Sequence, residues 1–342
     1  MRLLLLTKYG AAGPSSRYRF LQYVSEFHRA GHSLRIAPLF DDAYIRRLFN
    51  GQKSGKAYLV WRALMRVWVC LQGFRYDKVW IEGELVPYAP AWFERILHAA
   101  LPKRRYYDYD DAIWLRYPAH RQNKFANIWK GASCVVVGNQ YLASYVRENG
   151  AHVVTVPTVL EWARYQNAKP SHNTRVVGWI GTPQTVFYLQ ELAPALVALR
   201  KQTDYELRVI GAEWSHPELK INCRPWSLDK EIDELCQLDV GIMPLKDDPW
   251  SRGKCGLKLI QYLSCGIPAV ASPVGVNADF IEESGGGRTA SSAEEWISCL
   301  SELLTNVELR RDMGQRARKW AESRVTVHAQ AARLFEALEL DF

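Results

Sequence analysis

The chain has 342 residues, of which 48% are apolar and 23% charged, and its formal net charge at pH 7 is +8. This length favours two domains, and this composition excludes a fibrous or largely disordered chain. No stretch of about 18 residues is apolar and uncharged, so we expect no membrane-spanning helix, and seven cysteines without paired or ligand-like spacing indicate reduced thiols, a cytoplasmic location and no structural metal.

The strands and helices that the sequence predicts alternate along the chain. In the first half, strands are expected at 3–7, 33–38, 77–82, 105–109, 133–137 and 152–156, with helices at 16–30, 57–71, 92–101, 124–130 and 141–148. A polar, linker-like segment follows at 161–173, and strands resume at 175–180, 206–211, 239–243 and 267–271. Alternation of this kind predicts β-α-β units with parallel sheets, and hence an α/β fold built from two halves of similar size.

The positive charge is concentrated in the first half. Residues 1–170 contain 25 Lys and Arg against 12 Asp and Glu, whereas residues 171–342 contain 19 against 24. A basic half predicts an anionic partner, which a phosphorylated substrate, an anionic membrane or a nucleic acid would satisfy. We expect no nucleic-acid binding, because the cations form no recognition motif and the second half is acidic.

The helix at 57–71 has two interpretations. Trp61, Leu64, Trp68 and Leu71 lie on one stripe, with arginines between them. Such a stripe commonly packs into a protein core, and aromatic residues interspersed with cations also fit a membrane interface. Both interpretations fit the same spacing of residues along the helix.

Ligands in open α/β sheets bind outside the carboxyl ends of the strands, so the loops that follow strands are candidate sites. After the first strand, Ser16 and Arg17 stand at a helix start, where backbone amides favour a phosphate, although a serine there also caps helices. Asp110 and Asp111 follow the strand that ends with Asp108 and Tyr109. Clustered carboxylates can carry acid–base chemistry, hold a metal or bind sugar hydroxyls, and they can equally make structural hydrogen bonds.

In the second half, the loops after strands combine glycines with cations. Gly181 and Thr182 follow the strand at 175–180 and allow close approach of a phosphate or a sugar. Further along, a helix start is surrounded by Arg252, Lys254, Gly256, Lys258 and Gln261. Free amides at a helix start, together with fixed cations, are what a diphosphate requires. Lys258 stands on an otherwise apolar helix, and a cation packed there is costly without an anionic partner.

The stretch GLKLIQYLSCGIPAVASPVGVN, residues 256–277, resembles the signature region of glycosyltransferase family 4. GPSSRYRFLQYVSEFHRAGH is similar to the first loop and helix of that family, and VVGWIGTPQTVFYLQELAPAL is similar to the start of its second domain. The resemblance implies the GT-B fold, in which two Rossmann-like domains with parallel sheets face a central cleft. It further implies an acceptor domain at 1–165, a nucleotide-sugar domain at 171–320, and a last helix at 321–342 that packs back toward the first domain.

The implied activity is retaining, metal-independent transfer of a hexose from a nucleotide-diphosphate sugar, with no other cofactor. Asp110, Asp111 and Lys258 would be catalytic, and Ser16 and Arg17 would bind acceptor or phosphate. The donor contacts would be Gly181, Thr182, Arg252, Lys254, Gly256, Lys258 and Gln261. The acceptor would be a saccharide or a lipid-linked molecule in polysaccharide or glycolipid synthesis, and the protein would be cytoplasmic, with peripheral contact to the anionic inner face of the membrane.

The chain also departs from the family pattern. Gly253 and Gln261 stand where two glutamates are common, and Asp110 and Asp111 stand where a histidine is common. An amide at 261 still bonds to hydroxyls. If these changes disable transfer, the alternative is an epimerase of the same fold or an inactive protein that binds nucleotide sugars.

Overall fold

Two compact units make up the chain in a computed structural model that describes residues 1–49, 51–171 and 175–342. The first unit comprises Met1–Thr158, Gly253–Cys255 and Gln330–Phe342, and the second comprises Val159–Arg252 and Gly256–Ala329. The first segment of the first unit ends at Thr158, whereas the sequence predicts an end at 165. The linker expected at 161–173 contains a short helix, and its residues 172 and 173 lie outside the described residues.

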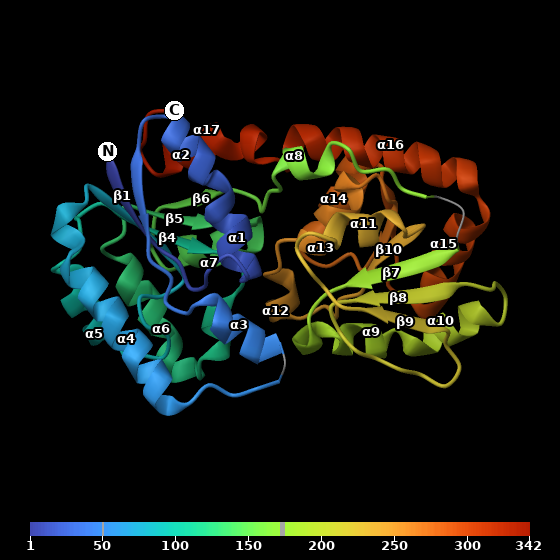
Figure 1. The fold of residues 1–342 in the computed structure, drawn as a ribbon, viewed down its shortest axis with the longest axis horizontal. Helices are drawn as coiled ribbons and strands as arrows, with labels where there is room; N and C mark the ends of the chain where they lie inside the picture. The colour runs from blue at the N-terminus through green and yellow to red at the C-terminus, as the bar shows by residue number, and fades with distance from the viewer. Residues whose placement is uncertain (50, 172–174) are drawn as a thin grey trace. The chain divides into compact units, whose positions relative to one another are not determined.

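The first unit contains a parallel sheet of six strands in the order β2-β1-β3-β4-β5-β6 (Figure 1). The strands are β1 (Arg2–Leu6), β2 (Ser33–Ile36), β3 (Lys78–Glu82), β4 (Arg105–Tyr109), β5 (Cys134–Val137) and β6 (Val153–Thr155). The helices are α1 (Pro14–Arg19), α2 (Val24–Arg29), α3 (Asp42–Phe49), α4 (Lys56–Leu71), α5 (Ala91–His98), α6 (Ala119–Trp129) and α7 (Gln140–Glu148). All six strands predicted for this half are confirmed.

The second unit also contains a parallel sheet of six strands, in the order β12-β11-β10-β7-β8-β9. Its strands are β7 (Val176–Ile180), β8 (Glu206–Ile210), β9 (Ile221–Arg224), β10 (Val240–Met243), β11 (Ala269–Ala271) and β12 (Gly287–Thr289). Its helices are α8 (Trp162–Tyr165), α9 (Phe187–Glu191), α10 (Ala193–Arg200), α11 (Glu231–Cys236), α12 (Pro249–Arg252), α13 (Leu257–Ser264), α14 (Val276–Ser284), α15 (Ala293–Thr305) and α16 (Val307–Arg324). The last helix, α17, covers Val327–Ala337.

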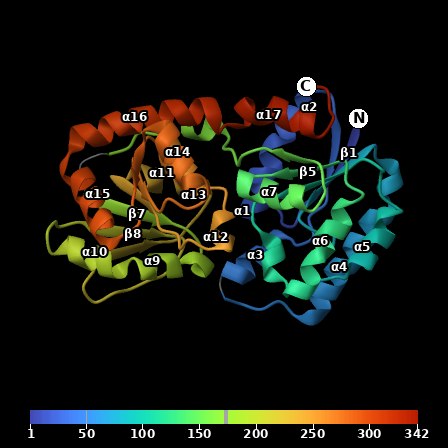
Figure 2. The same ribbon diagram turned by 180° about the vertical axis from the view of Figure 1, so that it is seen from behind.

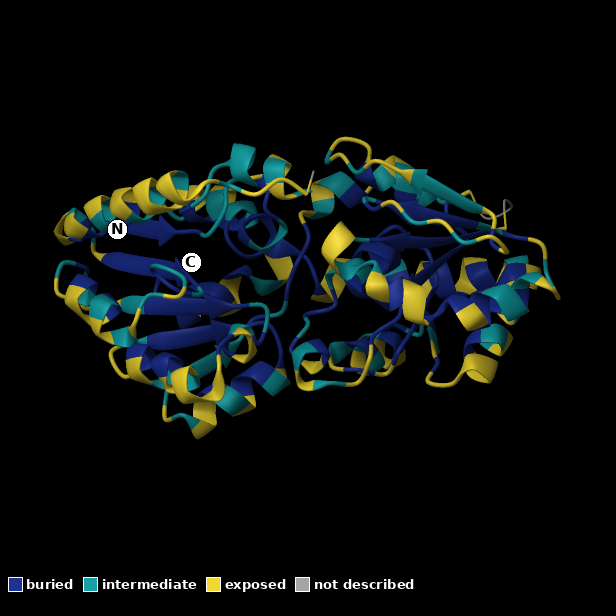
Figure 3. Ribbon diagram, turned by 90° about the horizontal axis from the view of Figure 1, so that it is seen from below, coloured by how far each residue is buried: buried dark blue, intermediate teal, exposed yellow. Residues whose placement is uncertain are grey.

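Helices cover both faces of each sheet (Figure 2), and most strands are buried (Figure 3). Two separate apolar cores result, one around Leu4, Ile81 and Val135 and the other around Val209 and Leu300. This layered arrangement confirms the predicted α/β class.

The prediction of one continuous helix at 16–30 is wrong. The helical backbone is interrupted at Phe20, which has a φ of −122°, and a short 3₁₀ turn at Leu21–Tyr23 separates α1 from α2. The ring of Phe20 is buried against Trp80 of β3, with 4.0 Å between the ring centroids. Burial of this ring therefore accompanies the break in the helix.

The apolar stripe on α4 faces solvent, so its interpretation as a core stripe is wrong. Trp61, Leu64 and Trp68 are exposed, whereas Arg66 is buried and donates a hydrogen bond to the carbonyl of Thr7. Arg62 donates to the carbonyls of the chain that leaves β2. Arg62 and Arg66 therefore face the protein beside the buried Cys70, whereas the large apolar side chains of the stripe face outward.

A buried ion pair joins α1 to β4. The guanidinium of Arg19 contacts both carboxylate oxygens of Asp108, at 2.8 and 3.0 Å, and both side chains are buried. Arg19 also donates to the carbonyl of Val156 at 2.6 Å. The pair thus fixes the first helix to the centre of the sheet.

We predict that Asp108→Asn lowers the free energy of unfolding by about 3–5 kcal/mol, because it leaves the buried charge of Arg19 without its counter-ion. The matched control is Glu302→Gln, which removes an exposed ion pair with Arg288 and should cost less than about 1 kcal/mol. Urea denaturation of both variants measures the difference. Equal losses of unfolding free energy in the two variants would show that the buried Arg19–Asp108 pair stabilises the fold no more than an exposed pair does.

Candidate active site

Each sheet has one position where the chain changes the direction in which it adds strands. In the first unit, the chain passes from β1 to β2 and then returns to add β3 on the other side of β1. In the second unit, β8 and β9 extend one side of β7, and β10 begins the other side. Ligands of open α/β sheets bind at such points, outside the carboxyl ends of the strands. The loops after β1, β3, β7 and β10 are therefore the candidate positions.

The two residues predicted to bind phosphate after β1 hold their own loop together. The Ser16 hydroxyl accepts a hydrogen bond from the backbone nitrogen of Tyr9 at 2.9 Å and donates one to Glu82 at 2.5 Å. The Arg17 guanidinium donates to the carbonyl of Ala11 at 2.9 Å. These contacts shape the loop between β1 and α1, and an anion at this position has to compete with them.

Glu82, the last residue of β3, is a candidate that sequence reasoning missed. It is buried, and its Oε2 also accepts a hydrogen bond from the backbone nitrogen of Lys8 at 2.7 Å. Its Oε1 is buried and has no hydrogen-bond partner among the described residues. Burial raises the pKa of Glu82 to about 7. An acid directly after the apolar run VWI, at the end of β3, is the signal that could have identified it.

Asp110 and Asp111 belong to one charged cluster with Lys254. The two oxygens of Asp111 lie 3.9 Å from Lys254 Nζ and 3.9 Å from a guanidinium nitrogen of Arg116. Desolvation raises the pKa of Asp111 to about 6, and the charge of Lys254 opposes this rise. The side chain of Lys8 interacts electrostatically with Asp111 and Glu82. The structure therefore brings predicted catalytic acids together with a lysine that was predicted to bind the donor.

Asp108 does not join this cluster, because its carboxylate is committed to Arg19. The three acidic residues in the segment DYDD thus divide into one structural residue and two that line the candidate site. Asp110 and Asp111 follow the end of β4 at Tyr109, so the alternation of side chains along the strand does not place them with Asp108.

The packing of Gly253 explains the absence of a carboxylate at that position. A Cβ on Gly253 would lie 2.9 Å from Ala112 Cβ and 3.0 Å from its backbone nitrogen. The thiol of Cys255 donates to the carbonyl of Asp110 at 3.1 Å, and Asn139 donates to the carbonyl of Lys254 at 3.0 Å. The segment 253–255 is therefore fixed closely against the loop after β4, with no room for a glutamate.

In the second unit, Lys258 lies over the side chain of Trp179. Its Nζ is 4.5 Å from the centre of the indole ring, and Trp179 is buried in β7. A Cβ on Gly181 would lie 2.3 Å from the same indole. The indole therefore links Lys258 of α13 to the loop that begins at Gly181, so that two predicted donor contacts share one neighbourhood.

Two helices begin side by side near Lys258. Gly256 precedes α13 with a φ of +68°, and Gly275 precedes α14 with a φ of +59°, a region that favours glycine. A Cβ on Gly256 would lie 3.0 Å from Val276 at the start of α14. The starts of two helices thus lie next to each other, and Lys258 is the second residue of one of them. Amides in the first turn of a helix have no carbonyl partner within that helix.

Buried amide side chains accompany these helix starts. Gln261 is buried in α13, three positions after Lys258. Asn277, which sequence reasoning missed, donates to the carbonyl of Ser272 at 3.2 Å, and its Oδ1 is buried without a hydrogen-bond partner among the described residues. Amides of this kind can bond hydroxyl groups of a ligand.

The other predicted donor contacts have partners of their own. Arg252 makes two hydrogen bonds to Asp247, at 2.6 and 2.9 Å, on the exposed surface. Thr182 begins a short 3₁₀ turn in a capping box with Thr185. For Arg252 to bind a donor, its ion pair with Asp247 would have to break.

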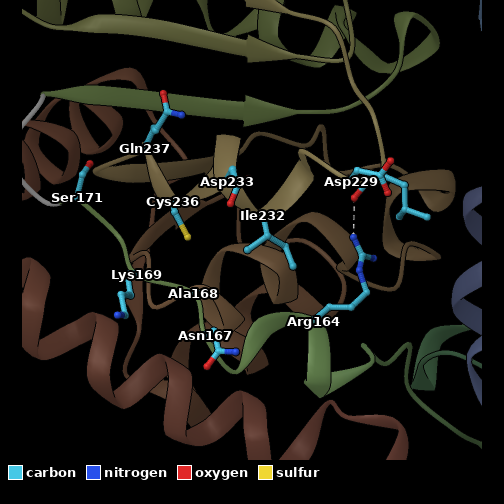
Figure 4. A pocket seen from close by; sticks show the side chains of 11 residues that line it. Arg164, Asn167, Ala168, Lys169, Ser171, Asp229, Ile232, Asp233, Cys236 and Gln237 are labelled. Carbon is cyan, nitrogen blue, oxygen red and sulfur yellow. Dashed lines mark hydrogen bonds between the residues drawn. The ribbon is translucent and has the colours of Figure 1, made fainter.

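A cavity of about 680 Å³ in the second unit lies elsewhere (Figure 4). It is lined by Arg164, Asn167, Ala168, Lys169, Ser171, Leu228, Asp229, Ile232, Asp233, Cys236 and Gln237. None of these is a predicted site residue. Within the part of the chain that the structure describes, no group of three or more His, Cys, Asp or Glu side chains is arranged to hold a metal ion.

A known protein family matches part of the second unit. Residues 174–306 match the family model described as glycosyl transferases group 1. Among curated protein sequences, none matches the chain significantly.

Solved structures of glycosyltransferases share the fold over nearly the whole chain. Sucrose-phosphate synthase from Thermosynechococcus elongatus is 14% identical, with a TM-score of 0.71 over 99% of this chain and 98% of that one. HepE of Anabaena, in complex with UDP and glucose, is 14% identical, with a TM-score of 0.73 over 99% of each chain. A glycosyltransferase from Rickettsia africae is 14% identical, with a TM-score of 0.72 over 99% and 97%. The chain therefore has the GT-B fold.

We predict that Glu82→Gln removes a pH-dependent loss of stability. The unfolded carboxyl ionises near pH 4.5, whereas the folded one keeps its proton until about pH 7. Burial therefore favours the protonated form, and the wild type should lose up to about 3 kcal/mol relative to the variant as the pH rises through this window. Urea denaturation between pH 4 and pH 8 measures this. If the free energy of unfolding changed with pH in the same way for both proteins, the raised pKa of Glu82 would be contradicted.

Proposed function

We propose that the protein is a glycosyltransferase that moves a hexose from a nucleotide-diphosphate sugar to an acceptor hydroxyl, with retention of configuration at the anomeric carbon. The observation that carries this proposal is the position of Lys258 over Trp179, beside the adjacent starts of α13 and α14. These residues lie within 174–306, the segment that matches the group 1 glycosyltransferases. HepE, which shares the fold, is known in complex with UDP-glucose, so a UDP-sugar is the first donor to test.

The second unit would hold the donor. The amides at the starts of α13 and α14 would bind the diphosphate, with Lys258 beside them, and Gln261 would bind a hydroxyl of the ribose or of the sugar. When the bond between the anomeric carbon and the diphosphate breaks, negative charge develops on the leaving phosphate oxygen. A cation and helix dipoles fixed in advance stabilise that charge without rearrangement, and we propose that they do so without a metal ion.

The first unit would hold the acceptor. Its charged cluster contains three carboxylates, Glu82, Asp110 and Asp111, together with lysine and arginine side chains. Carboxylates bind sugar hydroxyls, and one with a pKa near 6 can take the proton of the attacking hydroxyl near neutral pH. Asp111 is the residue to which we assign that proton transfer. The central cleft that the resemblance implies stays a prediction.

The acceptor that we propose is a saccharide or a lipid-linked molecule used in polysaccharide or glycolipid synthesis. The excess of cations in residues 1–170 supports an acceptor that carries phosphate. A lipid-linked acceptor would place the protein at the inner face of the membrane as a peripheral protein. No helix among the described residues is long and apolar enough to cross a bilayer.

We predict that Lys258→Ala abolishes the rise in melting temperature that a nucleotide-sugar donor produces, and lowers turnover by about 10²–10³-fold. The first panel contains UDP-, GDP-, ADP-, CMP- and dTDP-sugars. The control is Lys201→Ala, which removes an exposed lysine at the end of α10 and should leave the shift unchanged.

The outcomes separate the proposed function from its alternatives. A donor that is hydrolysed or transferred, with the product linkage in the donor's anomeric configuration by NMR, supports the retaining transferase. A new nucleotide sugar formed without any acceptor identifies an epimerase. Binding of a donor without turnover, under all acceptors tried, identifies an inactive binding protein. A shift that survives in Lys258→Ala shows that the diphosphate lies elsewhere.

We predict that the rate of transfer rises with pH through about 6, because the carboxylate form of Asp111 is the form that accepts a proton. In Asp111→Asn, this limb of the profile should disappear together with most of the activity. The measurement is kcat/KM for the donor between pH 5 and pH 8. A variant that retains both the limb and the rate would remove Asp111 from the mechanism.

A further inference from the structure

The exposed face of α4 and α5 is apolar and rich in tryptophan. On α4, the side chains of Trp61, Leu64 and Trp68 are 50%, 62% and 59% exposed. On α5, which packs beside α4, Trp92 and Ile96 are 62% and 61% exposed. Val60, Met65 and Leu71 of α4 and Phe74, which follows it, are also exposed. Single exposed apolar side chains are common on the surface of soluble proteins. A group of large ones next to one another marks an interaction surface.

An ordinary surface helix turns its large apolar side chains to the core. In α4, the smaller Val67, Val69 and Cys70 pack on the core, whereas Trp61 and Trp68 are exposed. Here Arg62 donates to the carbonyls of Pro38 and Leu39, and Arg66 donates to the carbonyl of Thr7. The two arginines therefore fix the polar face of the helix to the chain that leaves β1 and β2. The apolar face is held outward by specific hydrogen bonds.

The charge around this surface is mainly positive. Residues 43–76 contain seven Lys and Arg and no Asp or Glu. Of these cations, Arg46, Lys53, Lys56 and Arg75 are exposed around α4, and Arg95 is exposed on α5. The one acid of α5, Glu94, is buried against Lys124 at 3.0 Å. The exposed Asp77 follows this segment and pairs with Arg2, so an anionic surface would meet mainly cations.

We propose that this face of α4 and α5 is a docking surface for an anionic lipid bilayer. Tryptophan side chains partition into the interface between headgroups and acyl chains, and surrounding Lys and Arg bind anionic headgroups. A water-soluble protein partner would require no excess of positive charge, and a second copy of this positive surface would repel the first. The proposal gives the peripheral location proposed above a specific surface, and it rests on no step of the transfer reaction.

The experiment is flotation of the full chain with vesicles of phosphatidylcholine, alone and with phosphatidylglycerol. We expect binding to the anionic vesicles, and weaker binding at high salt. Trp61→Gln combined with Trp68→Gln should reduce the partition coefficient by about tenfold or more, with an unchanged melting temperature because both side chains are exposed. Replacement of Arg46, Lys53 and Lys56 by Gln should reduce the preference for anionic vesicles by a similar factor.

The matched control is Phe342→Gln, which removes an aromatic ring that is 65% exposed in the same unit but outside this surface. It should bind vesicles as the wild type does. The proposal is overturned if the wild type does not float, or if the tryptophan variant floats equally well. It is also overturned if the wild type is a dimer that ignores vesicles and the tryptophan variant is a monomer. Vesicle binding requires no donor, so it can succeed or fail independently of sugar transfer.

Discussion

Parallel pairing of all the strands in each described sheet is the constraint on which the rest of the structure depends. In a parallel sheet, every carboxyl end lies at the same edge, so the segments that follow β1, β3 and β4 must emerge close together although they are far apart in the sequence. Glu82, which contacts Ser16 66 residues away, is a direct result. The same constraint in the second unit brings the loop after β7 beside α13. Charged side chains gather there because the strand ends leave backbone groups and space that the apolar core cannot fill.

The sequence predicts the fold well because the signals for it are local. Six strands in the first half could be placed from short apolar runs, and Lys258 could be singled out because a lone cation on an apolar helix is costly. Glu82 could not be assigned a role, since its pKa depends on burial and on contacts with distant segments. The division of the DYDD acids into Asp108 and the other two depends likewise on Arg19, which lies 89 residues away. Local patterns carry no information about such partners.

The direction in which α4 faces was equally beyond the reach of the sequence. A helical period identifies a stripe but does not tell which side of the helix meets the protein. In this structure Arg62 and Arg66 orient the helix, because their guanidinium groups donate hydrogen bonds to carbonyls just after β1 and β2. Burial lowers the pKa of Arg66 to about 10, so the group stays charged at neutral pH. The helix with the outward tryptophans is thereby attached to the same strand ends that support the loop with Ser16 and Arg17.

The composition of the first unit has a consequence for work with separate fragments. Lys78, at the start of β3, is buried, and its ammonium donates hydrogen bonds to the carbonyls of Leu338 and Glu339. A fragment truncated at Thr158 would keep this ammonium in its sheet but lose both acceptors, together with the Phe335 ring that stacks on Phe27 at 4.9 Å. Removal of residues 330–342 would therefore uncover both Lys78 and the ring of Phe27. Expression of the first unit by itself would therefore require residues 330–342 to be joined to it through a linker.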